Sequence, residues 1–144
     1  MTLESLYDTD FNGWIDQTLQ LLRDRNFDEV DWINVMEEIE LLAHTDERTL
    51  DTYSARILEL LLLYAYQPEK RCKKWLVILC HTRWEIKQRL KDSPKLKEYL
   101  EENLQENYEH AVKIARIWTG MDKNCFPSVC RYSVDQLLDE DFLG

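Results

Sequence analysis

Three side chains in one predicted helix, Glu37, Glu40 and His44, have types that could bind a metal ion. At 100° per residue they fall in a strip about 60° wide beside the apolar face of the helix. Carboxylates and imidazoles on facing helices hold the metals of di-iron bundles, although those bundles use a Glu-x-x-His spacing. The spacing of Glu40 and His44 also fits an ordinary i,i+4 pair on a solvated face. We therefore treat the strip as a weak metal candidate and expect no cofactor.

Arg83 is the second candidate, because it lies in the middle of an otherwise apolar helical stripe. A guanidinium is rarely buried without a partner. Glu37 or Glu40 would suit it, since a carboxylate can accept two parallel hydrogen bonds from arginine. These three residues form a candidate polar cluster, either as a structural ion pair or as the floor of a pocket.

A third candidate is the turn that follows the longest predicted helix, where aromatic side chains with polar tips gather beside a proline. Its residues are Tyr64, Tyr66, Gln67 and Trp75. Such a cluster can line a ligand pocket or seal the end of a helical bundle. No catalytic residue is identified, because the chain has neither a nucleophile elbow nor a glycine-rich phosphate loop.

The elements that position these residues are predicted to be helices. Three glycines and three prolines in 144 residues are too few for a turn-rich β-protein, and apolar residues recur every three or four positions. The chain length suits one domain, residues 1–144. We predict an all-α, four-helix bundle-like fold with a long central second helix. The predicted helices span residues 9–25, 31–67, 69–91 and 93–119, followed by a short C-terminal helix opened by a capping box at residues 133–136.

The helix predicted over residues 31–67 contains no Gly or Pro, but its apolar stripe lapses over residues 44–49. A continuous helix over this range would be roughly 54 Å long, longer than a compact domain of about 40 Å. It must bend, or overhang so that a partner subunit covers the excess; we favour a continuous helix. Its last third is apolar almost all round and should be the most buried segment.

Local signals mark several helix ends. Phe27 and Trp32 are spaced for a hydrophobic staple if Asp28 caps the second helix. Pro68 should end that helix, and Gly120 should end the helix over residues 93–119. In the helix over residues 69–91, a second apolar patch of Val77, Cys80 and Trp84 lies away from the first. This helix should be covered on two sides, by its own fold or by a second copy.

The net charge of −10 argues against DNA binding, which needs a basic surface. Residues 70–97 nevertheless carry ten Lys or Arg and two acids. This segment is either neutralised within the fold or forms a basic face for RNA or phosphate. No apolar run is long enough to span a membrane, and no signal peptide is evident. Four cysteines without metal-ligand spacing indicate a cytoplasmic protein whose reduced thiols pack as small apolar residues.

Several short motifs together resemble a known family. They include the segments 7–14, 27–31, 37–40, 66–69, 92–96 and 137–142. The chain resembles the family catalogued as domain of unknown function 29, small bacterial proteins abundant in cyanobacteria. The resemblance implies an all-helical fold and no established reaction, so no catalytic residue is carried over. The family pattern often places a small residue where this chain has His44, which weighs against the metal candidate.

The sequence favours a non-enzymatic helical interaction module that binds a partner protein or a second copy of itself. The overlong second helix and the two apolar patches of the helix over residues 69–91 motivate this hypothesis. One alternative is a small metal-binding protein or enzyme that uses Glu37 and Glu40. A second alternative is RNA or phosphate binding on the basic segment 70–97.

Overall fold

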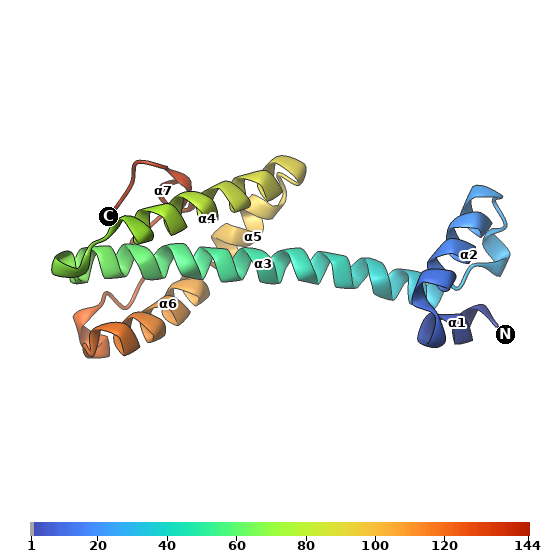
Figure 1. The fold of residues 1–144 in the computed structure, drawn as a ribbon, viewed down its shortest axis with the longest axis horizontal. Helices are drawn as coiled ribbons and strands as arrows, with labels where there is room; N and C mark the ends of the chain where they lie inside the picture. Colours follow the sequence, from blue (N-terminus) through green and yellow to red (C-terminus); the bar gives the residue numbers. More distant parts are fainter. Residues whose placement is uncertain (1) are drawn as a thin grey trace. The chain divides into compact units, whose positions relative to one another are not determined.

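The computed structural model describes residues 2–144, and all its regular secondary structure is helical. The α-helices are α1 (Leu3–Thr9), α2 (Phe11–Arg23), α3 (Trp32–Tyr66), α4 (Lys73–Asp92), α5 (Leu96–Glu102), α6 (Leu104–Thr119) and α7 (Val134–Leu138). Short 3₁₀ turns occupy Phe27–Glu29, Pro68–Lys70 and Lys123–Cys125. The described residues contain no strand, which confirms the all-α prediction (Figure 1).

α3 is continuous across the polar interruption at residues 44–49, as favoured from the sequence. By their contacts, the residues group into two compact units, 1–45 and 46–144, and the division falls within this interruption. We describe the two units separately as the N-terminal and C-terminal units.

The N-terminal unit is held by aromatic side chains and a buried carboxylate. The rings of Tyr7, Phe11 and Trp14 lie 5.0 to 5.8 Å apart between centroids. The indole N–H of buried Trp14 donates to the Asp31 carboxylate at 3.3 Å. Asp31 also accepts hydrogen bonds from the backbone N–H and the side-chain amide of Asn34, so it caps the first turn of α3.

The C-terminal unit has one apolar core to which all its α-helices contribute. Ile57, Leu58 and Leu61 of α3 are fully buried, and Leu79 and Ile86 of α4 join them. Further core residues come from α5, α6, the following loop and α7: Leu100, Tyr108, Ala111, Ala115, Phe126, Val134 and Leu137. The last third of α3 is therefore the most buried part of that helix, as predicted.

Local sequence signals located several helix ends correctly. α3 ends at Tyr66, directly before Gln67 and Pro68. Gly120 follows α6 with a φ of 70°, the left-handed conformation that glycine adopts without strain. Ser133 and Gln136 form the predicted capping box of α7.

One predicted helix begins slightly later than expected, and another is divided. The helix predicted over residues 9–25 is α2, which starts after Asp10 because the Asp10 side chain accepts a hydrogen bond from the backbone N–H of Gly13; the preceding helix α1 was not predicted. The predicted helix over residues 93–119 is interrupted at Asn103, which separates α5 from α6. Phe27 and Trp32 do contact each other, at 6.5 Å between ring centroids, although Asp31 rather than Asp28 caps α3.

None of the helices within residues 2–144 has the length and apolarity needed to cross a membrane. All four cysteines are free thiols: three are exposed, and Cys130 is partly buried. The interpretation of the thiols as core residues is therefore wrong for the three exposed cysteines, whereas Cys130 packs against the apolar core.

Candidate functional site

The first part of α3 leaves large apolar side chains uncovered. Trp32, Met36, Ile39 and Leu42 are 44%, 55%, 60% and 69% exposed. At 100° per residue they lie within about 60° of Ile39, so they share one face of the helix. We call these four residues the α3 stripe. The sequence predicted an apolar, core-facing side along this helix; the apolar side is present here, but the prediction that it is buried is wrong.

The segment around the α3 stripe is strongly acidic. Residues 28–47 contain eight Asp or Glu and no Lys or Arg. Glu40 lies beside the stripe and Asp46 one turn beyond it, and both are exposed. Glu38 accepts a hydrogen bond from the Tyr7 hydroxyl. That hydrogen bond is the largest cause that raises the pKa of Tyr7 to about 12. The α3 stripe is thus an apolar surface with a negative border.

The weak metal candidates, Glu37, Glu40 and His44, are all exposed on this part of α3. Within residues 2–144, no three His, Cys, Asp or Glu side chains come together in an arrangement that could hold a metal ion. At 100° per residue the three candidates lie about 100° to 160° from Ile39, away from the centre of the α3 stripe, and no donor cluster accompanies them in the described part of the chain.

Arg83 is buried, at 2% exposed, and its guanidinium binds backbone carbonyls. Nε donates to the oxygen of Leu137 at 2.6 Å, and the two terminal nitrogens donate to those of Glu140 at 3.4 Å and Phe142 at 2.7 Å. Burial lowers the pKa of Arg83, while the nearby carboxylates of Asp139 and Glu140 oppose that shift. These carbonyls take the place of the carboxylate partner, Glu37 or Glu40, that the sequence suggested. Arg83 fastens the C-terminal segment to α4.

The predicted turn cluster is divided between two roles. Gln67 and Trp75 line a pocket of about 460 Å³, together with Lys70, Lys74 and Trp118. Tyr66 instead packs against Phe126, with ring centroids 4.8 Å apart. The Tyr64 ring lies 4.1 Å from the Arg71 guanidinium, whose Nε also donates to the Tyr64 carbonyl.

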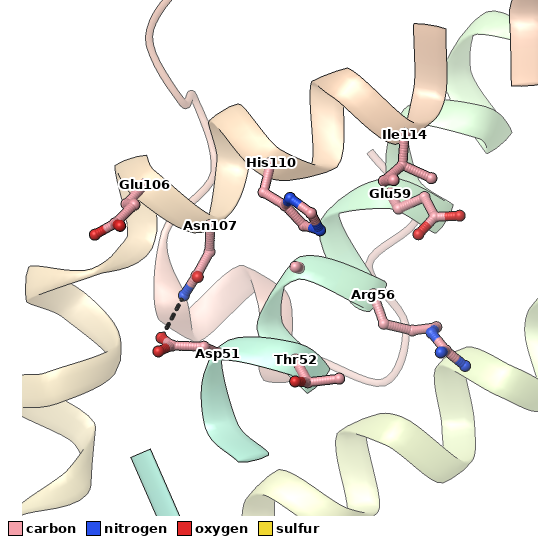
Figure 2. A pocket seen from close by; sticks show the side chains of 9 residues that line it. Asp51, Thr52, Arg56, Glu59, Glu106, Asn107, His110 and Ile114 are labelled. Carbon is pink, nitrogen blue, oxygen red and sulfur yellow. Dashed lines mark hydrogen bonds between the residues drawn. The ribbon is translucent and has the colours of Figure 1, made fainter. Parts of the chain in front are cut away.

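A neighbouring pocket of about 480 Å³ lies between α3 and α6 (Figure 2). Asp51 on α3 accepts hydrogen bonds from the Asn107 side chain at 3.0 Å and from the Tyr99 hydroxyl at 2.7 Å. Burial and the hydrogen bond to Asp51 raise the pKa of Tyr99. The sequence prediction missed this site, and its only signal was the polar Asn107 at the edge of an apolar helix face.

Arg56 and Glu59 of α3 line both pockets. His110 of α6 lines only the pocket of about 480 Å³ between α3 and α6. Burial raises the pKa of the Glu59 carboxyl, and the charges of Arg56 and His110 and a hydrogen bond from Trp118 partly offset this shift. These side chains offer donors and acceptors suited to a polar ligand.

The comparison with protein families gives one result. The model of the family described as "Domain of unknown function DUF29" matches residues 6–143, nearly the whole chain. The chain belongs to this family. The resemblance that the sequence motifs indicated is therefore confirmed, and DUF29 membership agrees with the all-helical fold. No curated protein and no solved structure matches this DUF29 chain.

Proposed function

We propose that this DUF29 protein is a non-enzymatic interaction module and that the α3 stripe is its protein-binding face. The supporting observation is the exposure of Trp32, Met36, Ile39 and Leu42, 44–69%, on one side of a helix. At these exposures the stripe presents roughly 400 Å² of apolar surface, a size at which patches on single chains are often functional. A cytoplasmic location, which four free thiols favour, is part of the proposal.

Burying the stripe is favourable but does not by itself guarantee stable binding. At about 25 cal/mol per Å², covering roughly 400 Å² contributes about 10 kcal/mol. Association costs about 4–15 kcal/mol in lost translational and rotational freedom. A partner must therefore add further contacts, and the negative border of the stripe determines their chemistry.

The partner best suited to this surface is a basic amphipathic helix. Helices pair through apolar residues repeated at three and four positions, which is the spacing of the α3 stripe. Lysine or arginine beside those residues would face the acids near the stripe, including Glu40. Two acidic copies of this segment would instead repel each other.

A synthetic amphipathic peptide tests the proposal directly. The probe is a fluorescently labelled peptide of about 21 residues with leucine at the heptad a and d positions and lysine elsewhere. We expect it to bind the protein with a fluorescence anisotropy change that weakens as salt rises. A scrambled peptide of the same composition controls for simple charge attraction, because it cannot present an apolar face.

The matched variants are Ile39→Asp, within the stripe, and Val129→Asp, at a 65% exposed position in a loop. Ile39→Asp should weaken peptide binding by about 10-fold or more, whereas Val129→Asp should leave it unchanged. Equal binding of both peptides, or equal binding by both variants, would show that the stripe is not the binding face.

A further inference from the structure

A second apolar surface lies on the outer side of α4. Val77 and Trp84 are 54% and 56% exposed, and Cys80 is exposed as well. At 100° per residue these side chains fall within about 60° of Val77, and so do Lys73 and Lys91 towards the two ends of the helix. We call these five residues the α4 face. Three of the five side chains are apolar and the lysines lie towards the ends, while His81, Gln88 and the acidic Asp92 fall within the same 60° of Val77.

The lysines of the α4 face are available for a partner. The ion pairs of this basic segment in the described chain join Lys87 to Glu140, Arg89 to Glu85 and Lys97 to Asp135. Lys73 and Lys91 are exposed, and neither takes part in an ion pair within residues 2–144. The predicted neutralisation of segment 70–97 is therefore partial.

The α3 stripe and the α4 face are complementary in both apolar character and charge. The stripe lies in residues 28–47, which carry eight acids and no Lys or Arg. The α4 face lies in residues 70–97, which carry ten basic side chains and two acids. Opposite charges around two apolar strips favour pairing of unlike surfaces over pairing of like ones.

We propose that the α3 stripe of one copy of this protein packs on the α4 face of a second copy. The inference rests on the proposed function, because it uses the α3 stripe as a binding face. In a symmetric dimer each contact occurs twice, so each copy buries both of its surfaces. Together they offer roughly 700 Å² per copy, close to the about 800 Å² per partner of a standard stable interface.

Trp84 is the expected anchor of this interface. Tryptophan is enriched among the residues that dominate binding energies, and Trp84 stands exposed at the apolar centre of the α4 face. Packing its ring between the apolar side chains of the α3 stripe would remove both surfaces from water. Trp84→Ser should therefore raise the dimer dissociation constant by about 30-fold or more.

The first experiment measures the mass of the full chain in solution by light scattering after size-exclusion chromatography. At tens of micromolar protein and about 50 mM salt we expect a dimer, which dissociates progressively at about 500 mM salt. A monomer at low salt would overturn the proposed dimer. If that monomer still bound the leucine–lysine peptide through Ile39, the interaction module would stand; otherwise both proposals would fail.

A charge exchange tests which surfaces meet. One variant carries Glu40→Lys and Asp46→Lys on α3, and the other carries Lys73→Glu and Lys91→Glu on α4. Each variant alone should dimerise less tightly than wild type, because the two reversed side chains then repel like charges on the facing surface. An equimolar mixture should form a heterodimer, because each α3 stripe now faces an α4 face of opposite charge.

Control reversals on other helices separate this interface from a general effect of net charge. Two control variants change the net charge by the same amounts through exposed residues elsewhere. One carries Glu101→Lys and Glu102→Lys on α5, and the other carries Lys113→Glu on α6 and Lys123→Glu just after it. Both controls should remain dimers, and circular dichroism should show unchanged helix content in every variant. Failure of the mixture to associate while the controls remain dimeric would overturn the α3–α4 pairing.

Discussion

Replacing Arg83 with methionine removes three hydrogen-bond donors from the interior of the C-terminal unit while keeping a long apolar side chain. The strongest bonds lost are those to the carbonyls of Leu137 at 2.6 Å and Phe142 at 2.7 Å; the contact to Glu140, at 3.4 Å, is weaker. A hydrogen bond from a charged donor contributes about 1.5–3 kcal/mol. Removing the buried charge also removes its desolvation cost, which offsets part of the loss. We expect Arg83→Met to lower the free energy of unfolding by about 2–4 kcal/mol.

Urea unfolding followed by circular dichroism measures that change. Hydrogen exchange measures a second one: the amides of residues 137–143 should exchange faster, because Arg83 fastens their segment. The matched control is Lys87→Met, which breaks only the exposed ion pair with Glu140 and should cost at most about 1 kcal/mol. A loss below about 0.5 kcal/mol for Arg83→Met, with unchanged exchange at residues 137–143, would refute the role assigned to the guanidinium.

Three further predictions concern the C-terminal unit. Asn107→Leu should lower the free energy of unfolding by about 1–2 kcal/mol, because the Asp51 carboxylate loses a hydrogen-bond donor. Thermal unfolding measures this change, and an unchanged melting temperature would contradict it. Gly120→Ala should lower the free energy of unfolding, measured with urea, by about 1 kcal/mol, because alanine is strained at the φ of 70° that Gly120 adopts. Thr119→Ala provides a neighbouring comparison. Burial is the largest cause that raises the pKa of Tyr108 from 10.0 to about 12, so its contribution to stability is present below pH 10 and is lost as pH rises towards 12. Absorbance titration of wild type against Tyr108→Phe checks this, and a midpoint near 10 for Tyr108 would contradict it.

The features that the sequence predicted well depend on local interactions. Pro68, Gly120 and the Ser133–Gln136 box end or begin helices through contacts within a few residues, so short motifs identify them. The helix start predicted at residue 9 lies two residues before the observed start of α2 at Phe11, which Asp10 caps, but the short helix α1 was missed.

The features that the sequence could not predict depend on distant partners. Periodicity shows which face of α3 is apolar, but it cannot show whether another element covers Met36 or Ile39. The position of Arg83 in an apolar stripe indicated burial correctly. Its partners lie 54 to 59 residues away and are backbone carbonyls, which every residue carries, so no residue type marks them. Of the predicted pocket residues, Gln67 and Trp75 line a cavity, while Tyr64 and Tyr66 make other contacts.

The bonds of Arg83 have a consequence for protein synthesis. The ribosome makes Arg83 more than fifty residues before it makes the carbonyls of Leu137 and Phe142. Until then, a cation that belongs in the core of the C-terminal unit has no partner there, and its burial is unfavourable. A nascent chain should therefore keep α4 only loosely docked until residues 137–142 leave the exit tunnel, so these residues lock the unit in its final packing.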